Sequence, residues 1–145
     1  MMEFNELIAD FAARHNVAGL AAETGRISLD IDHVAVSIAT GGDRVALSAE
    51  IGKPPARGRV EFADILLESN LESDAFFAKT RETDTYVLVR YLPLANLDGE
   101  SFDAALETLV NTAETWRRLL ADFHPAEAGG DAADAVFSPS GFMQV

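Results

Sequence analysis

Histidine is a common metal ligand and acid–base group, and the three histidines of this sequence lie far apart, at His15, His33 and His124. None of them has a second histidine or a carboxylate at a spacing that recurs in zinc sites. The chain has no cysteine, so it offers neither thiolate ligands nor disulfides. We therefore expect no metal centre.

The segment Asp30-Ile31-Asp32-His33 is the densest cluster of groups that could act as ligands or as acid and base. Side chains alternate between the two faces of a strand, so if Leu29 and Ile31 face the core, Asp30 and Asp32 share the opposite face. Acidic side chains arranged in this way form the ordinary solvated face of a sheet. We adopt this interpretation, and an enzyme that uses Asp30, Asp32 and His33 is kept as an alternative.

The motifs of nucleophilic and nucleotide chemistry are absent from the sequence. It contains no Gly-x-Ser-x-Gly, no Walker loop and no dinucleotide fingerprint. Carboxylates four residues apart, such as Asp103 and Glu107, are expected to be solvent-facing charges on a helix. Trp116 is in helical register with apolar neighbours, as a core residue would be. These residues give no candidate for nucleophilic catalysis, and we expect that the protein is not an enzyme.

Composition and charge limit the possible partners. The 145 residues are 48% hydrophobic, and 11 Lys and Arg against 24 Asp and Glu give a net charge of −13. Such a field repels phosphate, so we expect no nucleic-acid partner and no anionic membrane partner. Residues 1–6 lack the Lys or Arg of a signal peptide, and no apolar run approaches the ~18 residues that span a bilayer. These features indicate a soluble cytoplasmic protein.

The first half of the chain predicts one helix and three strands. Apolar residues spaced by three and four predict a helix from residue 3 to about 15. The period then changes to two, which predicts strands over 27–31, 34–38 and 45–51. Asp32-His33 and a Gly-rich turn at 40–43 connect them closely, so we expect an antiparallel meander.

The second half predicts a short helix from Val60 to about Asn70, strands over 75–78 and 85–92, and a long helix. The strand over 85–92 is apolar on both faces, so it is either central or covered by a partner. Asp98 is expected to cap a final helix of about 22 residues, and Pro125 to end it. We expect a domain over 1–124 and a flexible acidic tail over 125–145. The fold class is α+β, in the order α-β-β-β-α-β-β-α, with helices packed on a twisted antiparallel sheet.

Four segments in this order resemble a known family. Residues 20–32 are close to a Gly-then-Leu-x-Ile-Asp first strand, and 66–71 fit a Leu-Leu-x-x-Asn second helix. Residues 91–98 fit a Leu-Pro-Leu-x-x-Leu-Asp entry to the last helix, and 113–117 fit the end of that helix. Together they make the chain similar to the class I type III secretion chaperones of the Tir-chaperone (CesT-like) type over about residues 4–122.

The resemblance implies a homodimer in the bacterial cytoplasm that binds the N-terminal segment of a cognate effector and keeps it soluble and competent for secretion. It implies no catalytic residue and no cofactor. A binding or regulatory domain of the same fold without a secretion role is the alternative, because a fold does not fix a function.

Two surfaces follow from this interpretation. An extended effector segment needs apolar pockets between a helix and a sheet, together with a sheet edge for its backbone. We assign this role to Leu7, Phe11, Val17, Leu20, Leu29, Ile31 and Val36, among which Phe11 and Leu29 are the most expected to be core. The surplus of apolar side chains on the second helix and the fifth strand predicts a dimer interface at Phe62, Ile65, Leu66, Tyr86 and Leu88.

Overall fold

The computed structural model describes residues 3–17 and 25–125, and the elements within these ranges follow the predicted order. Leu20 and residues 126–145, to which the sequence assigned a binding role and a tail, lie outside the described residues. The element bounds are α1 Phe4–Arg14, β1 Arg26–Ile31, β2 Val34–Gly41, β3 Arg44–Gly52, α2 Arg59–Ser69, β4 Phe76–Thr80, β5 Thr85–Pro93 and α3 Gly99–Ala121.

The strands form one antiparallel sheet in the order β1-β2-β3-β5-β4. β5 therefore lies between β3 and β4, which confirms that the strand with two apolar faces is internal. β1 and β4 are the edge strands. The predicted two-residue turn joins β1 to β2, with Asp32 at φ 51° and His33 at φ 69°, a backbone region that Asp tolerates better than most side chains.

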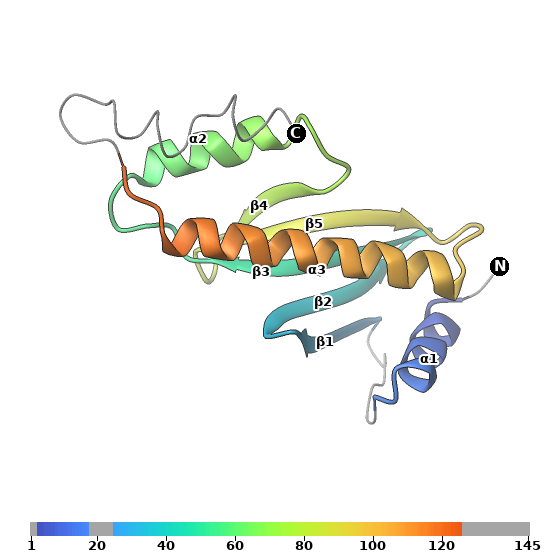
Figure 1. Ribbon diagram of the computed structural model, residues 1–145. Coiled ribbons are helices and arrows are strands. Elements are labelled where there is room, and N and C mark those ends of the chain that lie inside the picture. Colours follow the sequence, from blue (N-terminus) through green and yellow to red (C-terminus); the bar gives the residue numbers. More distant parts are fainter. Residues whose placement is uncertain (1–2, 18–24, 126–145) are drawn as a thin grey trace.

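The core lies between one face of the sheet and the helices. Alternate residues of β2 and β3 are buried, and so is the stripe of α3 from Phe102 to Trp116. Figure 1 shows α3 running along the sheet, with α1 and α2 near opposite ends of the molecule. Asp98 caps α3 as predicted, because its Oδ1 accepts a hydrogen bond of 2.8 Å from the Ser101 N–H.

An aromatic cluster fixes α2 to the rest of the molecule. Phe62 is fully buried, with its ring centroid 5.0 Å from that of Phe123, 5.8 Å from Tyr86 and 6.3 Å from Trp116. Phe77 of β4 packs its ring 4.7 Å from Trp116. These rings join α2, β4, β5 and α3, so the inner side of α2 belongs to the monomer's own core.

Candidate functional site

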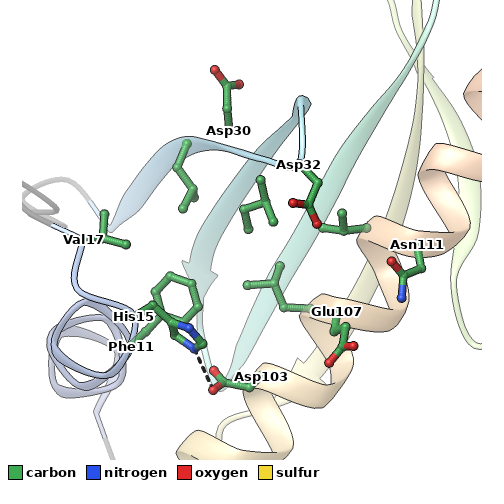
Figure 2. Close-up of a pocket in the computed structure, with 12 residues that line it drawn as sticks. Phe11, His15, Val17, Asp30, Asp32, Asp103, Glu107 and Asn111 are labelled. Atoms are coloured by element: carbon green, nitrogen blue, oxygen red, sulfur yellow. Dashed lines mark hydrogen bonds and ion pairs between the residues drawn. The ribbon is translucent and has the colours of Figure 1, made fainter.

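A groove of about 460 Å³ opens between α1, β1 and α3 (Figure 2). Its apolar lining comes from all three elements and from the residues that follow α1. The remaining lining side chains are polar or acidic. The apolar residues are Phe11, Val17, Leu29, Ile31, Leu106 and Val110, and the polar ones are His15, Asp30, Asp32, Asp103, Glu107 and Asn111.

The position of β1 explains why the groove is open. β1 is an edge strand, while α3 packs mainly against β3, two strands away. The core-facing side chains Leu29 and Ile31 are therefore only partly buried, whereas Ile27 on the same face is 5% exposed. An apolar sheet surface beside a free strand edge is left accessible.

Asp103 of α3 holds the end of α1 in place. Both guanidinium NH groups of Arg14 donate to its carboxylate, and Nε2 of His15 lies 2.9 Å from its Oδ2. Arg14 also donates from Nε to Asp10 at 2.7 Å. The sequence interpretation of Asp103 as a solvated charge is wrong, because its side chain is only 25% exposed and binds Arg14 of α1 and His15, which follows that helix.

This contact changes the acidity of both partners. Burial acts to raise the pKa of Asp103, but the hydrogen bonds from Arg14 and His15 outweigh it and hold that pKa below its ordinary value. The hydrogen bond to Asp103 raises the pKa of Arg14. Both groups therefore stay charged at neutral pH, and they join α1 to α3 along one wall of the groove.

The mouth of the groove is acidic. Figure 2 shows Asp32 coming from the β1–β2 turn and Glu107 from α3, on separate walls, while Asp30 points away from the groove. Among the described residues, Asp30, Asp32 and Glu107 take part in no ion pair.

Four of the seven residues assigned to effector binding line this groove: Phe11, Val17, Leu29 and Ile31. Phe11 is 5% exposed and belongs to the core, as expected, whereas Leu29 is only partly buried, contrary to our expectation, because an edge strand carries it. Leu7 is fully buried and Val36 is 3% exposed, so both lie in the monomer core and not in the groove. Val36 is covered because it lies on β2, which is the neighbour of β1 toward the centre of the sheet.

A second groove, of about 340 Å³, lies between α2, β4 and β5. Of the five residues assigned to a dimer interface, four are buried in the monomer and one is partly buried. Phe62, Tyr86 and Leu88 are no more than 5% exposed, Leu66 is 3% exposed, and Ile65 is partly buried. The exposed apolar side chains of this helix are instead Val60 at 68% and Leu67 at 65%, and both line the second groove.

Sequence reasoning missed the α3 wall of the first groove and the outer side of α2. Leu106 and Val110 are 3% and 2% exposed and form part of the groove lining. Helical spacing does not show which part of a buried stripe lies beside a groove. Helical spacing places Val60 and Leu67 off the face of α2 that contains Phe62 and Leu66, so the sequence pattern does indicate that these two apolar side chains are exposed.

The structure does not bring Asp30, Asp32 and His33 together in one pocket. Asp32 and His33 form an exposed turn, and His33 does not line the groove. Within residues 3–17 and 25–125, no three His, Asp or Glu side chains are grouped so that they could hold a metal ion. None of the helices described there is long and apolar enough to cross a bilayer.

The described residues form an α+β domain with an apolar groove beside the edge strand β1, and comparison with known proteins defines its class. The model of the Tir chaperone protein (CesT) family matches residues 6–117. The chain therefore belongs to this family, which confirms the resemblance to type III secretion chaperones. No curated protein matches the chain by sequence.

Solved structures share the fold. A chain of the ExsC–ExsE complex is 27% identical, with a TM-score of 0.71, and the match covers 80% of this chain and 92% of that one. The type III secretion chaperone SycH of Yersinia pestis, solved with a stable fragment of YscM2, is 22% identical, with a TM-score of 0.63 and coverages of 79% and 99%. YbjN of E. coli, a putative transcription regulator, is 14% identical, with a TM-score of 0.61 and coverages of 83% and 96%. The fold therefore also occurs in a protein described by another function.

Proposed function

We propose that this protein is a type III secretion chaperone that binds the N-terminal segment of a cognate effector in the groove between α1, β1 and α3. The observation that supports this most strongly is the accessible apolar face of β1 at Leu29 and Ile31, within a chain of the CesT family. The protein acts by binding alone, in the bacterial cytoplasm, and keeps the effector segment soluble before secretion.

The groove suits an extended segment. Successive side chains of an extended chain point to opposite sides, so alternate residues can enter the apolar groove while the others face water. In the part of the chain that the structure describes, no strand pairs with the outward edge of β1, so its backbone groups could pair with the backbone of the segment, as in other cases of strand addition to a sheet edge. SycH was solved with a protein fragment, a partner of the kind proposed here.

We also propose that the protein forms a homodimer. Val60 and Leu67 are two large apolar side chains exposed on one helix next to an apolar groove, and a partner surface would remove them from water. We place the dimer contact on this outer side of α2 and on β4, and not on the buried residues inferred from sequence.

The groove is tested by replacing Leu29 with Glu in the full chain. Leu29 is already partly buried, so binding covers only the rest of its side chain. The new carboxylate would, however, lie without a partner against apolar side chains in the complex, which costs at least about 1–3 kcal/mol, so binding should weaken about tenfold or more. The ligand is the N-terminal segment of a candidate effector that co-purifies with this protein. Affinity is measured by calorimetry, and melting temperature by circular dichroism.

Ser28→Glu is the matched control, because Ser28 is exposed on the same strand and its side chain points to the other face. This variant should bind within twofold of the wild type. If Leu29→Glu keeps both its melting temperature and its affinity, the segment does not bind in this groove.

A further inference from the structure

The unpaired carboxylates at the mouth of the first groove indicate which side chains the bound segment carries. Asp32 and Glu107 line the groove from separate walls and are exposed. Of the other two carboxylates in the lining, Asp103 is already bound to Arg14 and His15, and the side chain of Asp30 points away from the groove. Two negative charges next to an apolar floor therefore have no partner among the described residues.

No lysine or arginine elsewhere in the chain can supply that partner. Every Lys and Arg of the sequence lies within residues 3–17 or 25–125, and residues 18–24 and 126–145 contain none. Of the described cations, none forms an ion pair with Asp32 or Glu107. Arg14 is engaged by Asp10 and Asp103, and Arg26 of β1 does not line the groove.

We propose that the groove selects an extended segment in which Lys or Arg side chains flank the apolar side chains that enter it. The apolar residues enter between Leu29, Ile31 and Leu106, and the flanking cations lie beside Asp32 and Glu107. This inference rests on the proposed function, and it adds a charge requirement to the ligand. A segment with acidic residues at the same positions is rejected, because like charges then meet at the mouth of the groove.

The test uses two labelled synthetic peptides of equal length, in which Leu and Val alternate with either Lys or Glu. The protein is the full chain as wild type, as Asp32→Asn with Glu107→Gln, and as Glu72→Gln with Glu82→Gln. Glu72 and Glu82 are exposed, form no ion pair among the described residues and do not line the groove. Both double variants lose the same two charges, so the attraction due to the net charge of −13 falls equally in both. Asn is also compatible with the positive φ of position 32.

An exposed ion pair contributes about two- to threefold in affinity, so removal of both groove carboxylates should weaken Lys-peptide binding about fivefold relative to the matched variant. The preference of the wild type for the Lys peptide should also decrease as salt is raised. Equal binding of the two peptides to the wild type, or equal losses in the two double variants, would overturn the charge requirement and leave the groove as a binding site. If neither peptide binds, or if Leu29→Glu does not weaken binding, the groove itself is refuted.

Discussion

Replacing Leu67 with Asp should separate the proposed dimer without unfolding its subunits. Leu67 lies on the outer side of α2 with 65% of its surface exposed, whereas the adjacent Leu66 is 3% exposed. A charge at position 67 can therefore remain in water in the free subunit. The same charge at position 66 would be buried in the core.

The size of the effect follows from the exposed fraction. Full burial of a leucine side chain stabilises by about 1.5–3 kcal/mol, so burying the exposed two thirds of Leu67 contributes about 1–2 kcal/mol per copy. A two-fold interface buries the residue twice, which gives about 2–4 kcal/mol. The dissociation constant of the dimer should rise about 30- to 1000-fold.

Sedimentation equilibrium measures the dissociation constant, and circular dichroism follows thermal unfolding of each variant. Ser28→Glu serves as the charge control, because its exposed side chain lies on β1, at the opposite edge of the sheet from β4. Leu66→Asp should unfold the chain, since it places an unpaired charge in the core. A Leu67→Asp protein that keeps the wild-type dissociation constant would show that the outer side of α2 is not the dimer contact.

Three further predictions concern stability. Phe62→Ala should lower the free energy of unfolding by about 3–5 kcal/mol, measured by urea denaturation, because it removes the centre of the aromatic cluster; a loss below 1 kcal/mol would contradict this packing. The contact of Asp103 with Arg14 stabilises the fold fully at pH values above the ordinary pKa of an aspartate, which is near 4. This contribution is lost as the pH falls through the lowered pKa of Asp103. Wild type should therefore exceed Asp103→Asn in stability at pH 7 and approach it at pH 3, and a constant difference would refute the linkage. Deletion of residues 126–145 should shift the melting temperature by no more than a few degrees, because Phe123, the last core side chain among the described residues, is retained; a larger fall would show that the deleted residues stabilise the fold.

The elements of this fold could be predicted from sequence because each one is specified by local spacing. The two-residue turn at Asp32-His33 and the capped start of α3 at Asp98 are examples, since their signals lie within a few residues. The internal position of β5 also followed from its two apolar faces.

The accessible surfaces could be predicted only in part, because exposure depends on what distant elements cover. Leu66 and Leu67 are adjacent and identical in type, yet one is buried and the other faces water. Asp103 and Arg14 are 89 residues apart, so no local pattern predicts their contact. Leu29 and Ile31 are accessible because their strand is at the sheet edge, and the order of strands is a property of the whole chain.

Hydrogen exchange of the full-length protein, free and bound to the effector's N-terminal segment, tests the central claim most directly. Among residues 3–17 and 25–125, no strand pairs with the outward-pointing amides of β1, while its other amides pair with β2. The account predicts that binding slows exchange in β1 and in the groove walls of α1 and α3, and leaves β4 unchanged. Slower exchange confined to α2 and β4, with β1 exchanging as in the free protein, would contradict it.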